Sequence, residues 1–320
     1  MTGVHPARVA DPRLVADVLA GLWQSPPTLP PRWFYDETGS RLFDEITRRP
    51  EYYPSRRESE ILRARAGEVA ELTAAEALIE LGSGTSTKTR LLLDAFSAGG
   101  RSLIFAPLDV SAEVLFESAA AIGAAYPSVT VRPVVGDFGE AFGELPGRPG
   151  RRLVAFLGST IGNFEPDERR AFLRRLRSAL VPGDHLLLGA DLVKDPSRLV
   201  AAYDDAAGVT AAFNRNLIDV LARELDADGL SADDFRHVAR WNARLSRIEM
   251  WLRARRDVRA SFRAIHREWV LPAGAEMLSE ISVKFQPRAL RQELSGCGFA
   301  VRRQWTDARH DFSVTLATAG

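Results

Sequence analysis

Short apolar runs recur through the middle of the chain, and each is long enough to form one buried strand. They occupy residues 77–81, 102–110, 129–135, 152–157 and 185–192. Amphipathic stretches that suit helices separate several of these runs, at residues 86–97, 111–126 and 167–180. Strands that alternate with helices pair in parallel and carry helices on both faces of the sheet. The pattern therefore predicts a doubly wound α/β core.

The C-terminal part departs from this alternation. A helix is expected over residues 287–294, and two strand-like runs, 299–305 and 312–317, follow it with only a short polar turn between them. Strands this close together must pair antiparallel, because a parallel crossover needs about a dozen residues. An α/β sheet that ends in such a hairpin is the layout of class I methyltransferases. We therefore predict a seven-stranded, Rossmann-like sheet of that type.

Two blocks of the chain do not fit this core. Residues 1–70 precede the first strand, and residues 196–286 interrupt the alternation with a helical part at 199–225 and strand patterns at 235–241, 247–252 and 258–269. We expect the two blocks to form an α+β substrate-binding lid domain. Residues 71–195 and 287–320 would form the core, whose strands end where open α/β sheets bind ligands.

Composition and net charge disfavour several classes of binding partner. The 320 residues carry 42 Lys and Arg against 42 Asp and Glu, and a formal net charge of zero disfavours nucleic acid as the main partner. No signal-like N-terminus and no apolar run near the roughly 18 residues of a membrane span are visible, which predicts a cytoplasmic protein without a membrane partner. One cysteine and five histidines without ligand spacing predict no metal site. We expect a monomer.

Polar residues follow three consecutive predicted strands. Gly82 and Gly84 open the helix after the first strand, where close backbone approach and free helix N–H groups suit a ligand. Asp109 ends the second strand and can accept both hydroxyls of a ribose, while Asp137 and Phe138 end the third and can bind and cover an adenine. A nicotinamide fingerprint would need glycine at Thr87. Together these residues indicate an adenosine site with S-adenosylmethionine as ligand, although each alone could be a helix cap or a core residue.

The fourth strand ends in a polar loop bracketed by glycines, Gly158 to Gly162, and followed by Asn163. A methyltransferase presents its acceptor substrate at this position. The Asn163 amide can both donate and accept hydrogen bonds, so it suits the carboxylate or amine of an amino acid, or it caps the next helix.

Six motifs resemble the family of S-adenosylmethionine-dependent, histidine-specific methyltransferases of ergothioneine biosynthesis. The motifs are EYYPSR at 51–56, LGSGTSTKTR at 81–90, FLGSTIGN at 156–163, LGADLVK at 188–194, FNRN at 213–216 and EMLSEISVKF at 276–285. The resemblance runs from about Trp33 to the C-terminus. FLGSTIGN and EMLSEISVKF are not general methyltransferase features, which makes the match specific, and departures lie mainly in the N-terminal segment and residues 226–275.

The resemblance implies two sets of binding residues. The donor S-adenosylmethionine would be bound by Tyr35, Gly82, Lys88, Asp109, Asp137 and Phe138. The acceptor would be bound by Tyr52, Asn163, Tyr203, Met250, Glu280 and Ser282, with Asn163 and Tyr203 at its carboxylate, Tyr52, Glu280 and Ser282 at an imidazole, and Met250 lining the side-chain pocket.

The resemblance thus implies trimethylation of the α-amino group of L-histidine to hercynine. A Glu280 carboxylate can accept an imidazole N–H, which agrees with histidine. The amine must be neutral at each round, and Tyr35, Asn163 or water are the candidates to guide its proton because no strong base is evident. The alternatives are an Nα-methyltransferase for another amino acid such as tryptophan, and a nucleotide-binding oxidoreductase or sensor.

Overall fold

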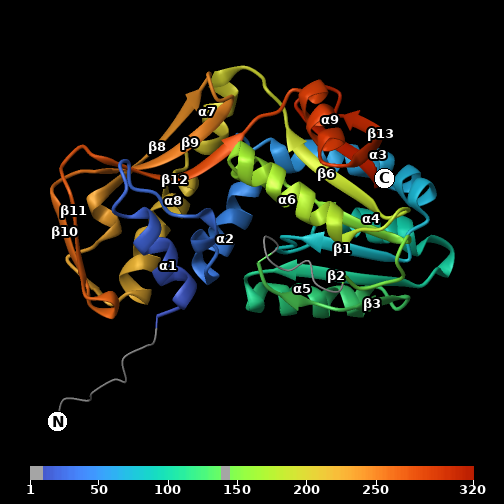
Figure 1. Cartoon of the computed structure of the whole chain (residues 1–320), viewed down its shortest axis with the longest axis horizontal. Helices are drawn as coiled ribbons and strands as arrows, with labels where there is room; N and C mark the ends of the chain where they lie inside the picture. Colours follow the sequence, from blue (N-terminus) through green and yellow to red (C-terminus); the bar gives the residue numbers. More distant parts are fainter. Residues whose placement is uncertain (1–9, 138–144) are drawn as a thin grey trace, which may run out of the picture. The chain divides into compact units, whose positions relative to one another are not determined.

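The computed structural model describes residues 10–137 and 145–320, which divide into two compact units. Unit 2 consists of residues 47–199, 242–247 and 282–320, and it contains a mixed sheet (Figure 1). Across that sheet the strands are β13 (Phe299–Thr306), β14 (Phe312–Ala319), β6 (His185–Asp191), β5 (Arg152–Phe156), β1 (Ala77–Leu81), β2 (Leu103–Asp109) and β3 (Val129–Val131), and β4 (Val134–Val135) also pairs with β2.

The strand directions confirm the predicted fold class. β3, β2, β1, β5 and β6 pair in parallel, whereas β14 pairs antiparallel with both β6 and β13. The sheet therefore is an α/β sheet that ends in an antiparallel hairpin. The short β4 adds an eighth strand to the seven that were predicted.

Both faces of this sheet are covered by helices. Leu78 packs with residues of α3 (Pro54–Thr73) and α4 (Thr89–Ser97), and with Ile122 of α5 (Ala112–Ala125). The next residue, Ile79, packs instead with α6 (Pro166–Ala179) and α9 (Pro287–Gly296). Successive side chains of a strand point to opposite faces, so the fully apolar runs seen in the sequence are strands buried on both sides.

Three predicted elements are each divided in two. The run at 129–135 is interrupted at Pro133, which has no N–H to donate, and becomes β3 and β4. The run at 258–269 is a hairpin of β10 (Val258–Phe262) and β11 (Arg267–Leu271) that turns at His266, where φ is 52°. The helical part at 199–225 is α7 (Pro196–Tyr203) and α8 (Val209–Glu224), because the Asp205 carboxylate accepts the Val209 and Thr210 N–H groups and so begins a new helix.

Unit 1 consists of residues up to 46, 200–241 and 248–281. Its helical elements include α1 (Pro12–Gly21), the 3₁₀ turn η1 (Pro31–Phe34), most of α2 (Glu37–Thr47), the end of α7, and α8. Two three-stranded sheets complete it, in the orders β11-β10-β7 and β12-β9-β8, where β7 is Ala227–Asp228, β8 is Phe235–Asn242, β9 is Arg247–Ala254 and β12 is Glu276–Val283.

The boundary between the units differs from the one expected near residue 70. Unit 2 begins at Thr47 and so includes α3, which packs on the large sheet. That the core binds the donor and the lid domain binds the substrate remains a prediction. Among the described residues, no helix has both the length and the apolar character that crossing a membrane requires.

A buried ion pair ties the start of β5 to the turn before β6. The Asp184 carboxylate, 0% exposed, accepts hydrogen bonds from Arg152 at 2.6 and 3.0 Å and from the backbone N–H groups of Gly150 and Val181. Burial pushes the pKa of Asp184 upward, but the bonds from Arg152 and Val181 outweigh burial and hold the pKa below its ordinary value. The charged carboxylate is therefore fully satisfied.

We expect Asp184→Ala to lower the free energy of unfolding by about 3–5 kcal/mol, because it leaves the Arg152 guanidinium buried without its anion. Urea denaturation followed by circular dichroism measures the loss. Asp167→Ala in the same unit is the control, since Asp167 is 96% exposed and pairs with Arg170 on the surface of α6. Equal unfolding midpoints for the two variants would contradict the assignment.

Candidate functional site

The loop after β1 has backbone conformations that depend on glycine. Gly82 and Gly84 have φ of 68° and 48°, in the left-handed region that is unfavourable for residues other than glycine. The Gly82 N–H donates to the Leu108 carbonyl at 2.8 Å, and the Gly84 N–H donates to the Asp109 carboxylate at 2.8 Å. The loop is thus fixed against the end of the neighbouring strand β2.

Asp109 and Asp137 lie at adjacent strand ends, as the strand order required. The Asp109 carboxylate also accepts the Ser111 N–H at 3.0 Å, and the Asp109 carbonyl accepts the Gly136 N–H at 3.0 Å. Asp109 is paired with Val135 of β4, and Asp137 comes two residues after the end of β4. Gly82, Asp109 and Asp137 therefore border one edge of the sheet, whereas Phe138 lies outside the described residues.

Lys88, at the start of α4, is held by a carboxylate that the sequence did not single out. Its ammonium forms an ion pair with Glu58 of α3, which is 0% exposed. The two Glu58 oxygens also accept the Gly158 N–H, each at 2.9 Å. Glu58 therefore links Lys88 to the loop after β5, and an alanine at Gly189 of β6 would place its Cβ 1.9 Å from Glu58 Oε1.

Glu80 is a second buried carboxyl beside the glycine loop. It lies in β1 and is hydrogen-bonded by the hydroxyls of Ser86, at 3.3 Å, and Thr89. Burial raises the pKa of Glu80 to about 8, more than the two hydroxyls and the nearby Lys88 lower it. The acid form therefore predominates at neutral pH.

The loop after β5 is strained and tightly packed. Gly158 and Ser159 have φ of 76° and 62°, and the Ser159 hydroxyl accepts the Asp191 N–H at 2.9 Å. A Cβ on Gly162 would approach the Val283 carbonyl to 2.7 Å, so this loop lies directly against the end of β12. Asn163, half-buried, ends the 3₁₀ turn η3 (Thr160–Asn163) and so lies near the segment that carries Ser282.

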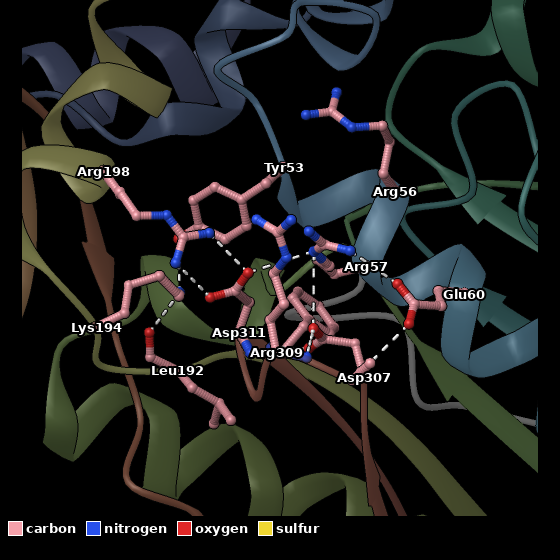
Figure 2. Close-up of polar contacts among 12 residues, drawn as sticks. Tyr53, Arg56, Arg57, Glu60, Leu192, Lys194, Arg198, Asp307, Arg309 and Asp311 are labelled. Carbon is pink, nitrogen blue, oxygen red and sulfur yellow. Dashed lines mark hydrogen bonds and ion pairs between the residues drawn. The ribbon is translucent and has the colours of Figure 1, made fainter.

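Asp191, at the end of β6, is in contact with several positively charged and polar groups. Its carboxylate, 0% exposed, accepts the Tyr53 hydroxyl at 2.8 Å and pairs with the ammonium groups of Lys194 at 2.5 Å and Lys284 at 3.0 Å. The charged groups of Lys194 and Arg198 lie 4.3 and 5.3 Å from the centre of the Tyr53 ring (Figure 2). Tyr52, the predicted substrate residue, is the buried neighbour of this anchored tyrosine.

Arg198 extends the charged cluster to the hairpin between β13 and β14. Its guanidinium donates to both oxygens of Asp311 at 2.8 and 2.7 Å, and Arg57 of α3 pairs with the same carboxylate at 3.3 Å (Figure 2). Burial lowers the pKa of Lys194, whereas Asp191 and Asp311 raise it, and burial prevails. The cluster fixes the N-terminal end of α3 to the C-terminal end of β6 and to the start of β14.

In unit 1, Tyr35 belongs to an aromatic cluster around α8. Its ring lies edge-on to Phe43 of α2 and to Phe213 of α8, both at 5.7 Å between ring centres. Phe213 stacks on Phe34 at 4.7 Å, and the Asn216 amide donates to the Asp36 carboxylate at 2.8 Å. Phe213 and Asn216 of the FNRN motif therefore hold the segment on both sides of Tyr35.

Tyr203, at the end of α7, is positioned through its backbone by a buried histidine. His237 Nε2 lies 2.8 Å from the Tyr203 carbonyl, and the Asn214 amide lies 2.8 Å from His237 Nδ1. Burial lowers the pKa of His237. A neutral ring with its proton on Nε2 satisfies both contacts, since the carbonyl can only accept and the amide NH₂ only donate.

Met250 and Glu280 come from adjacent strands of unit 1. Met250, 2% exposed, lies in β9, and its carbonyl accepts the Ser279 hydroxyl of β12 at 2.9 Å. Glu280 is the next residue of β12 and is half-buried.

The structure thus gathers Gly82, Lys88, Asp109 and Asp137 in unit 2, together with Tyr52, Asn163 and Ser282, while Tyr35, Tyr203, Met250 and Glu280 belong to unit 1. The supporting residues missed by sequence reasoning are Tyr53, Glu58, Glu80, Asp191, His237 and Lys284. Three of them carried a usable signal, because a charged residue inside an apolar run, as in ALIEL, LLLGADL and ISVKF, is rarely buried without a partner. In the described ranges no three His, Cys, Asp or Glu side chains are grouped as metal ligands would be.

The sheet order and its C-terminal antiparallel hairpin are those of the class I methyltransferase fold. The CcbJ methyltransferase of Streptomyces caelestis has a similar fold, with a TM-score of 0.50 and 16% identity over 89% of this chain and 100% of that one.

A family model described as histidine-specific methyltransferase, SAM-dependent, matches residues 14–319, and the chain belongs to this family. The resemblance inferred from the motifs is confirmed, and the protein is an S-adenosylmethionine-dependent N-methyltransferase. The alternative of an oxidoreductase or a non-catalytic sensor is therefore not retained.

Relatives of the chain are named for different amino acid substrates. The chain is 54% identical to a histidine N-alpha-methyltransferase of Mycolicibacterium smegmatis, over 94% of this chain and 93% of the relative. Identity to a protein of the same name from Mycobacterium tuberculosis is also 54% over the same shares. A 4-dimethylallyltryptophan N-methyltransferase of Claviceps purpurea is 28% identical over 74% of this chain and 75% of the relative.

The raised pKa of Glu80 predicts a pH-dependent stability. Between the ordinary pKa of 4.5 and about 8, the folded state keeps a proton that the unfolded state has lost, so the free energy of unfolding falls as pH rises through this window. Glu80→Gln keeps a neutral, hydrogen-bonding side chain at every pH. Relative to the parent protein, we expect this variant to gain stability steadily between about pH 5 and about pH 8.

Urea denaturation at several pH values measures this difference. Glu76→Gln is the control, because Glu76 directly precedes β1 and its side chain is 48% exposed. Its stability should parallel that of the parent protein. A constant difference between Glu80→Gln and the parent protein across the window would show that Glu80 does not titrate as argued.

Proposed function

We propose that the enzyme methylates the α-amino nitrogen of L-histidine three times, with S-adenosylmethionine as donor, and releases the betaine hercynine as the first step of ergothioneine biosynthesis. The observation that carries this proposal is the 54% identity, over 94% of the chain, to two proteins named histidine N-alpha-methyltransferase. The implied acceptor residues Tyr52, Asn163, Tyr203, Met250, Glu280 and Ser282 are all present.

For the donor, we assign Asp109 to the two ribose hydroxyls. Its two oxygens each hold one backbone N–H, from Gly84 and Ser111, and each oxygen keeps further lone-pair capacity for a hydroxyl. Asp137 and Phe138 would bind and cover the adenine, and Gly82 would allow the donor to approach the backbone. Lys88 and Tyr35 complete the donor set.

For the acceptor, we assign Asn163 and Tyr203 to the histidine carboxylate, and Tyr52, Glu280 and Ser282 to the imidazole. Glu280 and Ser282 are two residues apart in β12, so both side chains leave this strand on the same side. A carboxylate and a hydroxyl can contact the two nitrogens of one imidazole. An indole offers a single N–H and needs more space beside Met250.

Catalysis would depend on how the residues place the amine relative to the methyl group. Bound S-adenosylmethionine supplies a methyl group that its sulfonium already activates. The residues then have to align the amine and keep it dry and neutral. Asn163 and Tyr35 are the groups we assign to guide the amine proton. Gly158, Ser159 and Thr160 are small, which leaves room for a nitrogen that already carries one or two methyl groups.

Mass spectrometry after incubation with S-adenosylmethionine and either histidine or tryptophan tests the acceptor and the number of transfers. We expect histidine to gain three methyl groups and tryptophan none. Methylation of tryptophan in place of histidine would favour the activity named for the Claviceps relative.

Glu280→Ala should weaken histidine binding by about 10-fold to 100-fold, because it removes a charge-assisted hydrogen bond of about 1.5–3 kcal/mol. Calorimetric titration of histidine in the presence of S-adenosylhomocysteine measures this change, and binding of S-adenosylhomocysteine itself should be retained. Glu268→Ala, an exposed carboxylate of the same unit, is the control. Unchanged histidine affinity in Glu280→Ala would remove Glu280 from the acceptor site.

Asp109→Asn should weaken binding of S-adenosylhomocysteine by about 10-fold to 100-fold, because an amide cannot accept a charge-assisted bond from each ribose hydroxyl. Asp94→Asn on α4 is the matched control, since Asp94 accepts the Tyr126 hydroxyl on the surface of the same unit. If both variants bound the donor product equally well, Asp109 would have no part in donor binding.

A further inference from the structure

His237 is a buried histidine to which the proposed function gives no role. It lies in β8, and its side chain is 2% exposed. Its ring nitrogens contact different residues, because Nε2 lies 2.8 Å from the Tyr203 carbonyl and Nδ1 lies 2.8 Å from the amide nitrogen of Asn214. All three residues belong to unit 1. His237 therefore lies between the FNRN motif of α8 and the tyrosine assigned to the substrate carboxylate.

The Trp251 carbonyl fixes the orientation of the Asn214 amide. Asn214 is 0% exposed, and its NH₂ group donates to this carbonyl at 3.1 Å while it also faces His237 Nδ1. Turning the amide over would place its oxygen against the Trp251 oxygen, and neither of these two acceptors has a hydrogen to donate. The NH₂ group is therefore the part of Asn214 that faces His237.

This contact fixes the tautomer of His237. Because an amide NH₂ group can only donate, Nδ1 must accept, and the ring proton lies on Nε2. The Nε2–H group then donates to the Tyr203 carbonyl, whereas the Asp204 carboxylate, 4.0 Å from the same nitrogen, is beyond hydrogen-bond distance. Burial lowers the pKa of His237, which agrees with a neutral ring.

The bond from His237 holds the C-terminal end of α7. Tyr203 is the last residue of this helix, and the carbonyls of the last turn of a helix have no partner within the helix. The Nε2–H group of His237 supplies a partner for one of them. The bond therefore holds the backbone of Tyr203, and with it the start of the tyrosine side chain, against β8.

We propose that His237 is a positioning residue of the acceptor site, which holds Tyr203 where its hydroxyl binds the carboxylate of the amino acid substrate. This inference rests on the proposed function, in which Tyr203 contacts that carboxylate. His237 itself does not touch the substrate and acts through Tyr203. Loss of the bond to the Tyr203 carbonyl should therefore weaken histidine binding and leave binding of S-adenosylhomocysteine unchanged.

Two amide substitutions separate the bond to Tyr203 from the bond to Asn214. In His237→Gln the longer amide can still donate to the Tyr203 carbonyl and accept from Asn214. In His237→Asn the shorter side chain keeps an acceptor for Asn214 but does not reach Tyr203. Calorimetric titration of histidine with S-adenosylhomocysteine present should give a Kd within about 3-fold of the parent value for His237→Gln and about 10-fold higher for His237→Asn, which loses one hydrogen bond.

A double-mutant cycle with Tyr203→Phe tests whether His237 acts through Tyr203. Tyr203→Phe removes the hydroxyl and should raise the histidine Kd by about 10-fold to 100-fold. In that background His237→Asn should change the Kd by less than about 3-fold, because the group that it positions is already absent. A general loosening of unit 1 would instead multiply the two losses.

His266→Asn is the matched control, because it is the same substitution at an exposed histidine of unit 1, in the turn between β10 and β11. It should leave the histidine Kd unchanged. His237→Phe keeps a ring without any polar atom, and it should show the same loss of about 10-fold if His237→Asn does not fold. Thermal unfolding and binding of S-adenosylhomocysteine establish which variants fold.

The positioning role would be overturned by a Kd within about 3-fold of the parent value in a folded His237→Asn or His237→Phe. Equal losses in His237→Gln and His237→Asn would overturn it too, as would multiplied losses in the cycle, including a double variant with no measurable binding. If only His237→Gln folded, His237 would be needed for the structure itself, which also overturns the proposal.

Failure of the proposed function gives a different result. The parent protein would then bind no histidine, whatever the residue at position 237. If the parent protein bound histidine and Tyr203→Phe bound it equally well, the assignment of Tyr203 to the carboxylate would be wrong, and the positioning role of His237 would fall with it.

Discussion

The arrangement of unit 2 depends on the ion pairs and hydrogen bonds that surround the buried carboxylate of Asp191. A charge without access to water is tolerated only when opposite charges and hydrogen bonds surround it. Lys194, Lys284 and Tyr53 meet this requirement, and they come from the chain after β6, the end of β12 and the start of α3. The cost of burying one anion therefore specifies that two distant segments, the end of β12 and the start of α3, must lie at the end of β6.

Glu58 acts in the same way one strand away. It is buried at the point where α3 passes the ends of β5 and β6, and its partners are the Lys88 ammonium and the Gly158 N–H. Because a Cβ on Gly189 would meet Glu58 Oε1 at 1.9 Å, the glycine of the LGADLVK motif is explained by the carboxylate beside it. Two acidic side chains thus align the loops that carry the proposed donor and acceptor residues.

The sequence alone predicted the elements that are determined by residues close together in the chain. Apolar runs located the central strands, and the rule that parallel strands end at one edge placed Gly82, Asp109 and Asp137 together. It missed interruptions caused by single residues, such as Pro133 between β3 and β4 and Asp205 at the start of α8. It also missed Glu58, Asp191 and Lys284 as a supporting set, because their partners are far away in the sequence and only the folded chain brings them together.

The strained loop after β5 connects these two features. A non-glycine residue in the left-handed region costs about 1–2 kcal/mol, and Ser159 adopts it with φ of 62°. The bond that its hydroxyl accepts from the Asp191 N–H, and the bonds that the Gly158 N–H donates to Glu58, offset this cost. The loop is therefore held by the same two acidic residues that gather the buried lysines. Removal of the Glu58 carboxylate would leave the Gly158 N–H without this acceptor, whereas the bond to the Ser159 hydroxyl comes from the Asp191 backbone and does not depend on the Asp191 carboxylate.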